Sequence, residues 1–366
     1  MTLRDRMMAV YRNQRPDQVP VGIYGRYLPR GSCERQVRGW GVGLIESYPL
    51  VSLLAPPWHV SPGFLSEVQG ANLRTEHAWQ AGQRVELRTY ETPVGTVRQC
   101  STVDPTFGSD WIREFCVKQP EDYRILTYLV EHTVFRRQEA GFQAACANLG
   151  DDGVVLGRVD RSPYQKVLIE LAGPERFLMD LATDLDPVGE LLAALDRRLN
   201  EAFALVLESQ AEVIWQPENL TVDMTPPPAF AQYNLPFYER HGAALHAAGK
   251  RYVVHMDGRL GPLRNLIARS PVDVVESFSL PLMGGDLTFA EARAAWPQKV
   301  ILPNFPAALA LRPDGEIEAF LEQWLSEAGT ELPWMLQFSE DIPPDQWQRV
   351  VPLVAHYLDR TQRATS

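Results

Sequence analysis

After residue 150, short apolar runs alternate with longer amphipathic stretches. The apolar runs are rich in β-branched residues and lie at 153–159, 211–217, 251–257, 272–278, 299–305 and 332–338. Helical spacing of apolar positions is clearest over 187–210 and 316–329. Continuous apolar strands that each precede an amphipathic helix are typical of a parallel sheet covered by helices. This half of the chain is therefore predicted to consist of regular βα repeats.

The first 150 residues are less regular. A strand is predicted over 18–25, a short helix over 34–41 and a longer helix over 119–140. Residues 72–103 alternate around "ETPVGTV", in which Pro93 and Gly95 indicate the turn of a β-hairpin excursion.

With the N-terminal strand and a further strand near 50–57, the total is about eight strands, as in a closed (β/α)8 TIM barrel. An open, doubly wound sheet is the alternative, but no G-x-G-x-x-G loop follows any of these strands. We expect one α/β domain over 1–366, with an N-terminal elaboration over about 1–150 and regular repeats over about 151–366.

Net charge limits the classes of binding partner, and cysteine content indicates the compartment. The 366 residues carry a formal net charge of −11, which argues against nucleic acid or an anionic membrane surface as a partner. The sequence has no 18-residue apolar run and no apolar signal segment near its start. Its four cysteines have no paired spacing, which suits a reducing compartment. We therefore expect a cytoplasmic protein.

Polar side chains follow nearly every predicted strand. In a TIM barrel, the carboxyl ends of the strands form one rim, where the chemistry of such enzymes is located. The residues at these ends are Tyr24, Arg26, Arg30, Cys33, Glu34, Arg158, Asp160, Trp215, Glu218, Asn219, His255, Asp257, Glu276, Asn304, Ser339, Glu340 and Asp341.

Four of these residues carry the strongest chemical signal. His255, Asp257, Glu276 and Glu340 supply one imidazole and three carboxylates. Such a set offers nitrogen and oxygen ligands for zinc or a harder divalent ion. It equally offers a general acid and base, because crowded carboxylates raise one another's pKa. Carboxylates after strands also cap helices, so each residue taken singly has a structural explanation as well.

The remaining rim residues are candidates for substrate binding. Arg26 and Arg30 suit an anionic group, because arginine binds carboxylates and phosphates through two parallel hydrogen bonds. Further candidate contacts to a small molecule in the barrel mouth are Tyr24, Trp58, Arg158, Trp215, Glu218 and Asn304. The thiol of Cys33 is a weaker candidate for the same mouth.

Over nearly its whole length, the sequence resembles the uroporphyrinogen decarboxylase superfamily, which includes corrinoid-dependent methyltransferases. The resemblance depends on the opening 21 residues and on "ETPVGTV", "LAGPERFLMDLATDLDPVGELLAAL", "GAALHAAGKRYVVHMDG", "VILPNFP" and "FSEDIPPDQW", in this order. It implies a TIM barrel, in agreement with the strand pattern.

Within the superfamily, the sequence departs from the true decarboxylases. Their "RQAGRYLP"-like stretch is "GIYGRYLP" here, so that Arg26 remains while Gly22 replaces the first arginine. Their essential aspartate falls in a region, 48–60, that contains no acid in this chain.

The methyltransferase branch is closer. Its zinc ligands, His-x-Cys, a glutamate one strand later and a second cysteine, correspond to His255, Asp257, Glu276 and Glu340. Carboxylates in place of both cysteines make transfer to a thiol acceptor less favourable. They remain compatible with removal of a methyl group that is linked to oxygen or nitrogen.

Three functions therefore remain open. The first is a small-molecule methyltransferase or demethylase, assisted by a divalent metal or by acid and base. The second is decarboxylation of a carboxylated substrate, and the third is ligand binding without catalysis. The resemblance also makes a corrinoid carried by a partner protein a candidate cofactor, and a homodimer a candidate assembly.

Overall fold

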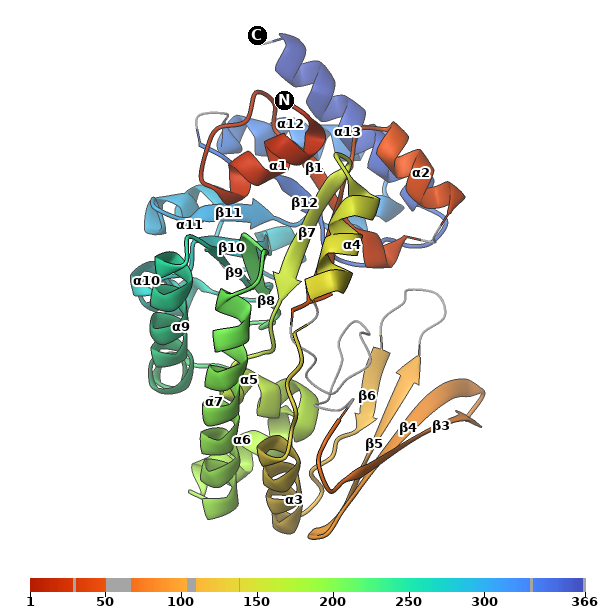
Figure 1. Cartoon of the computed structure of the whole chain (residues 1–366). Helices are drawn as coiled ribbons and strands as arrows, with labels where there is room; N and C mark the ends of the chain where they lie inside the picture. Colours follow the sequence, from red (N-terminus) through yellow and green to blue (C-terminus); the bar gives the residue numbers. More distant parts are fainter. Residues whose placement is uncertain (29–30, 51–66, 104–109, 138, 330–331, 365–366) are drawn as a thin grey trace. The chain divides into compact units, whose positions relative to one another are not determined.

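The computed structural model describes residues 1–28, 31–50, 67–103, 110–137, 139–329 and 332–364 (Figure 1). The chain divides into two compact units, which we describe separately. The first unit comprises Met1–Tyr48, Ala140–Arg158 and Ala211–Ser366, and the second comprises Pro49–Glu139 and Val159–Gln210. That they form one domain stays a prediction.

The first unit contains the predicted α/β barrel. Its parallel strands are β1 (Val21–Tyr24), β2 (Gly43–Pro49), β7 (Gly153–Arg158), β8 (Val213–Gln216), β9 (Arg251–His255), β10 (Val274–Phe278), β11 (Val300–Pro303) and β12 (Leu336–Phe338). Their order in the sheet is β11-β10-β9-β8-β7-β2-β1-β12. A parallel bridge between Asn304 and Gln337 connects the two ends of this order, so the sheet closes into a TIM barrel.

Helices alternate with these strands. They are α1 (Leu3–Tyr11), α2 (Ser32–Gly39), α4 (Glu139–Leu149), α8 (Pro227–Ala229), α9 (Leu235–Ala247), α10 (Arg264–Arg269), α11 (Phe289–Ala295), α12 (Asp314–Ala328) and α13 (Trp347–Ala364). The first of them, α1, begins with a capping box in which the Thr2 hydroxyl accepts from the Asp5 amide and the Asp5 carboxylate accepts from the Thr2 amide.

The barrel interior is an apolar core. Val154, Val213, Val274 and Val300, near the starts of their strands, lie in one buried cluster with Val253 from the middle of β9. Buried side chains of α1 (Met7, Val10 and Tyr11) belong to the same cluster. Side chains of α1 thus pack against the apolar interior of the barrel, and functional groups in such barrels lie at the carboxyl ends of the strands.

One barrel strand lies at a position that the sequence analysis did not predict. The strand expected near 50–57 falls largely outside the described residues, and β2 occupies 43–49 instead. Only its first half is fully buried, and Glu46 and Tyr48 interrupt its apolar character. The sequence therefore lacks the continuous apolar run by which the other strands were recognised.

The second unit contains an antiparallel sheet with the order β3-β4-β5-β6. Its strands are β3 (Asn72–Gln80), β4 (Gln83–Thr92), β5 (Gly95–Val103) and β6 (Asp110–Glu114). The turn between β4 and β5 lies at Pro93 and Val94, which confirms the predicted hairpin. Flanking strands on both sides extend this hairpin to four strands.

Helices α3 (Pro120–Glu131), α5 (Pro163–Lys166), α6 (Pro174–Ala182) and α7 (Asp186–Leu207) complete the second unit. The helix predicted over 119–140 ends at Glu131, because the backbone of Thr133 forms a bridge with Val68. None of the described helices is both long enough and apolar enough to cross a membrane.

Candidate active site

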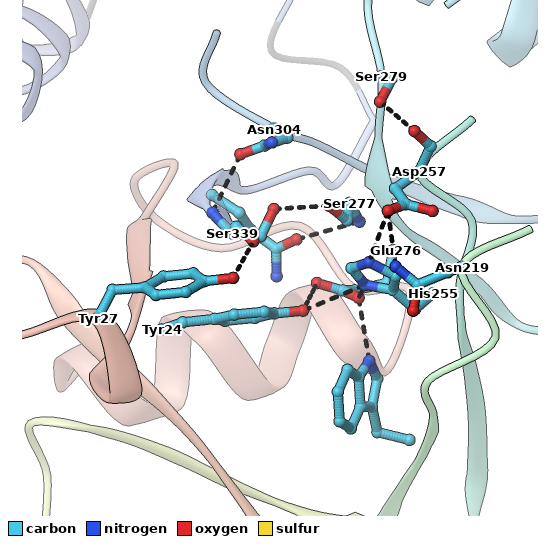
Figure 2. A network of polar contacts seen from close by, with 12 residues as sticks. Tyr24, Tyr27, Asn219, His255, Asp257, Glu276, Ser277, Ser279, Asn304 and Ser339 are labelled. Atoms are coloured by element: carbon cyan, nitrogen blue, oxygen red, sulfur yellow. Dashed lines mark hydrogen bonds and ion pairs between the residues drawn. The ribbon is translucent and has the colours of Figure 1, made fainter. Parts of the chain in front are cut away.

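Two neighbouring strands bring His255 and Glu276 together. His255 is the last residue of β9, and Glu276 of β10 is its register partner (Figure 2). The pairing of β10 with β11 is interrupted after Val275, and Ser277 adopts a left-handed φ of 59°. This irregularity places the Ser277 hydroxyl 2.7 Å from the hydroxyl of Ser339, which directly follows β12. Bulges of this kind re-aim side chains next to functional sites.

The carboxylate of Glu276 is completely buried and accepts hydrogen bonds from three side chains. The Tyr24 hydroxyl donates to Oε1 at 2.5 Å. The Trp215 indole Nε1 and His255 Nδ1 lie 3.0 Å and 2.7 Å from Oε2. Strands β1, β8, β9 and β10 thus each contribute one member of a single polar cluster.

His255 lies between two carboxylates. Its Nδ1 faces Glu276, and its Nε2 lies 3.3 Å from Asp257 Oδ2. Burial acts to lower the pKa of His255, but the negative charges of Asp257 and Glu276 and the hydrogen bonds to both raise it to about 10. Burial likewise opposes ionisation of Asp257, yet the attraction of His255 holds the pKa of that carboxyl below its ordinary value. His255 is therefore an imidazolium at neutral pH, with both N–H groups donating.

Asp257 is itself held in place from two sides. Asn219 Nδ2 donates to its Oδ2 at 2.9 Å, and the Ser279 hydroxyl donates to its backbone carbonyl at 2.6 Å. The carboxylate is 27% exposed, so it forms the solvent-facing side of the cluster.

Arg26 follows β1 and lies beside the same cluster. Its guanidinium stacks over the Tyr27 ring, 4.5 Å from the centroid, and donates to the Tyr27 hydroxyl. Tyr27 in turn stacks on Tyr24 with ring centroids 5.8 Å apart. Within the described part of the chain, the buried Nε of Arg26 has no hydrogen-bond partner.

Glu340, after β12, completes the predicted set. Burial raises the pKa of its carboxyl, and the negative charge of Asp257 raises it further, while His255 acts in the opposite direction. Glu340 is therefore close enough to both residues for their charges to act on it. That Glu340 acts together with His255, Asp257 and Glu276 in one site stays a prediction from the strand-end pattern.

The other candidates are described by their own contacts. Arg158 is half-buried and is the register partner of Trp215. Asn304 is fully buried and accepts from the Ser339 amide. The buried Glu218 faces α9, where Tyr238 donates to it. Asp160 is paired with Lys166 inside the second unit.

Two candidates, Arg30 and Trp58, lie outside the described residues. All four cysteines are free thiols, and Cys33 is partly exposed.

Several residues of the site escaped the sequence analysis. Ser277 and Ser279 flank the end of β10 in "ESFS", and Tyr27 follows Arg26 in "GRYLP". Serines after a strand are common in loops, so the sequence gives no signal for them. Tyr27 could have been found from its position between two candidates, Arg26 and Arg30.

In the arrangement described, the ring nitrogens of His255 are engaged with carboxylates rather than with a divalent ion. Both ring nitrogens of His255 face carboxylates as donors, which leaves neither lone pair for a metal. Among the described residues, no three His, Cys, Asp or Glu side chains are grouped so as to hold a metal ion. The predicted zinc site stays a prediction, and no step below depends on it.

The comparisons with known proteins agree with the fold. No family model and no curated protein matches the sequence. Among solved structures, a methyltransferase from Methanosarcina mazei is similar to this chain, with a TM-score of 0.59 over 99% of both chains. The identity of 12% means that the likeness concerns the fold alone.

Proposed function

We propose that this chain is an enzyme of the methyltransferase type that removes an oxygen- or nitrogen-linked methyl group from a small molecule. The observation that carries the proposal is the position of the His255 ring, which lies between the carboxylates of Glu276 and Asp257 at the carboxyl ends of the barrel strands. The sequence resemblance and the fold of the Methanosarcina mazei methyltransferase support this direction.

In this proposal His255 is a fixed charge and Glu340 is the proton donor. Both N–H groups of His255 already donate to Glu276 and Asp257, so the ring has no proton to offer a substrate without breaking an ion pair. Glu340 is suited to proton donation because burial and the charge of Asp257 raise the pKa of its carboxyl.

The proposed step is the transfer of a methyl group from the substrate to an acceptor. The bond between the methyl group and the substrate oxygen or nitrogen breaks, and its electron pair stays on that atom. The same atom takes the Glu340 proton, and the methyl group forms a bond to a nucleophilic acceptor. A corrinoid held by a partner protein, the acceptor that the sequence resemblance suggests, would supply such a nucleophile. Protonation of the leaving atom lowers the barrier because no free anion has to depart.

Arg26 suggests that the substrate also carries a negative charge. Its guanidinium is stacked on Tyr27 and therefore fixed in orientation, and its Nε is without a hydrogen-bond partner in the described part of the chain. A carboxylate or phosphate on the substrate would satisfy this donor.

Arg26 also supports the second candidate function, decarboxylation. An arginine that binds a carboxylate beside a proton donor could hold the substrate while carbon dioxide leaves and Glu340 protonates the carbon. The same cluster therefore serves both reactions, and the products must distinguish them.

The main test compound is a methoxybenzoate, which carries both a methyl ether and a carboxylate. Purified protein is incubated with a methoxybenzoate, and in parallel with a methylamine, in the presence of reduced cobalamin as acceptor. We expect methylcobalamin to form, at a rate that falls at least about 100-fold in Glu340→Gln, the scale of one general acid. Arg26→Gln should raise KM for the methoxybenzoate. Asp345→Asn, at an exposed acid nearby in sequence, is the control.

Three results would contradict the proposal. Full activity of Glu340→Gln would remove the proposed acid. Release of carbon dioxide without methyl transfer would favour decarboxylation. Binding of the methoxybenzoate without any product, unaffected by Glu340→Gln, would favour a non-catalytic binding protein.

A further inference from the structure

We infer that Glu218 is a positioning residue, which holds Asp257 beside His255 by way of Asn219. The inference concerns the geometry of the cluster to which the proposed function assigns a role. Its test uses no substrate, so it can fail or succeed independently of that function.

Glu218 is a carboxylate that is completely buried behind the end of β8. It accepts hydrogen bonds from Gln216 Nε2 at 2.7 Å and from Tyr238 of α9 at 3.0 Å. Asn234, at the end of the π-helical turn Phe230–Asn234 that precedes α9, donates to it at 3.3 Å. A buried carboxylate is costly unless it is hydrogen-bonded, so these bonds fix the backbone at Glu218 against α9.

The next residue, Asn219, contacts the cluster directly. Asn219 has a left-handed φ of 50°, a conformation that asparagine tolerates better than most residues. In this conformation its side chain points toward the end of β9 (Figure 2), and Nδ2 donates to Asp257 Oδ2 at 2.9 Å. The same oxygen faces His255 Nε2.

The loop after Asn219 is packed directly against the loop after His255. A side chain on Gly258 would place its Cβ 2.2 Å from Thr221 Cβ, so only glycine permits this approach. The Val222 amide donates to the Arg259 carbonyl at 2.9 Å. These contacts leave the Asn219 amide little freedom to move away from Asp257.

These contacts fix the orientation of the Asp257 carboxylate, which would otherwise rotate. Asp257 is 27% exposed, and solvent competes for its oxygens. A hydrogen bond from a side chain on a rigid loop keeps Oδ2 on His255, as supporting bonds do for ligating or catalytic groups. Asp257 acts on His255, and Glu218 and Asn219 determine where Asp257 lies.

The experiment observes the two N–H protons of His255 separately. In ¹⁵N-histidine-labelled protein, strongly hydrogen-bonded imidazolium protons give downfield resonances, which His255→Asn assigns by their loss. Asn219→Gly removes the amide while allowing the left-handed φ. We expect the Nε2 proton, on the Asp257 side, to be lost through exchange with water. The Nδ1 proton, on the Glu276 side, should remain.

Two further variants make the result specific. Glu218→Gln keeps the size of the side chain and should speed the exchange of the Nε2 proton with water, by less than Asn219→Gly does. Glu239→Gln makes the same chemical change at an exposed residue of α9 and should change neither proton. An unchanged Nε2 proton in either Asn219→Gly or Glu218→Gln would overturn the inference. Equal loss of both protons would overturn it as well, because that indicates general loosening of the site.

Discussion

At the scale of single residues, the charge of His255 depends on its two acidic neighbours, which differ in burial. Glu276 is fully buried and 2.7 Å from the imidazole, whereas Asp257 is 27% exposed and 3.3 Å away. Removal of one partner from a buried ion pair leaves an uncompensated charge, while an exposed partner is replaced by water. The two carboxylates should therefore contribute unequally to stability.

Glu276→Gln should lower the free energy of unfolding by about 3 kcal/mol, because it leaves the buried imidazolium without its closer partner. Asp257→Asn should cost about 1 kcal/mol, since solvent reaches that side of the ring. Urea denaturation at pH 7 measures both. A larger loss for Asp257→Asn than for Glu276→Gln would mean that the assignment of the inner and outer partner is reversed.

At the scale of an element, strand β10 does more than supply Glu276. Its pairing with β11 shifts between Val275 and Phe278, and Ser277 takes a left-handed φ of 59°. Residues other than glycine pay for that conformation, and such strain persists where the surrounding structure imposes it. In β10 it turns both Glu276 and Ser277 toward polar partners, which regular alternation along a strand would not do.

Two substitutions at Ser277 test this strain. Ser277→Ala and Ser277→Gly both remove the hydroxyl that contacts Ser339, so they differ in backbone preference. Ser277→Gly should be the more stable of the two by about 1 kcal/mol, the cost of a left-handed residue with a side chain. In an ordinary strand the order is reversed. Thermal or urea unfolding of the pair gives the answer.

At the scale of the whole molecule, stability should depend on pH through His255. Its pKa of about 10 exceeds the ordinary value of 6.5, so the folded state binds this proton more tightly than the unfolded state does. The stabilisation is complete below pH 6.5 and is lost as pH rises through about 10. His255 itself is not expected to lower the free energy of unfolding as the pH falls below 6.5.

The measurement compares wild type with His255→Gln across this range. The difference in their free energies of unfolding should shrink steadily from pH 6.5 to pH 10. Lys299, whose pKa burial lowers to about 8, titrates in both proteins, so its effect cancels. A difference that stays constant over this range would mean that the imidazole is not held as a cation.

A second whole-molecule prediction concerns metal. Because both nitrogens of His255 donate to carboxylates, dialysis against a chelator should leave the thermal midpoint unchanged. Mass spectrometry of protein purified without added metal should find no stoichiometric zinc. Zinc that is present in the wild type and absent from His255→Asn with its fold intact would instead establish the ligand set predicted from the sequence.

Much of the barrel could be predicted from the sequence. Apolar runs such as 251–257 and 272–278 are long enough to indicate strands buried on both faces. The polar residues that interrupt such a run near its end lie toward the rim of a barrel, which is why His255 and Glu276 could be placed together. Strand β2 was missed because its outer half is only partly buried.

The sequence by itself determined the parallel barrel and the identity of the residues at its rim, because both follow from hydrophobic spacing along the chain. The tertiary structure alone decided which way those side chains point. Glu218 and Asn219 are adjacent in sequence, yet one faces α9 and the other faces Asp257. Side-chain direction at a strand end depends on local backbone angles and on packing between loops distant in sequence, and neither is encoded in a periodic pattern.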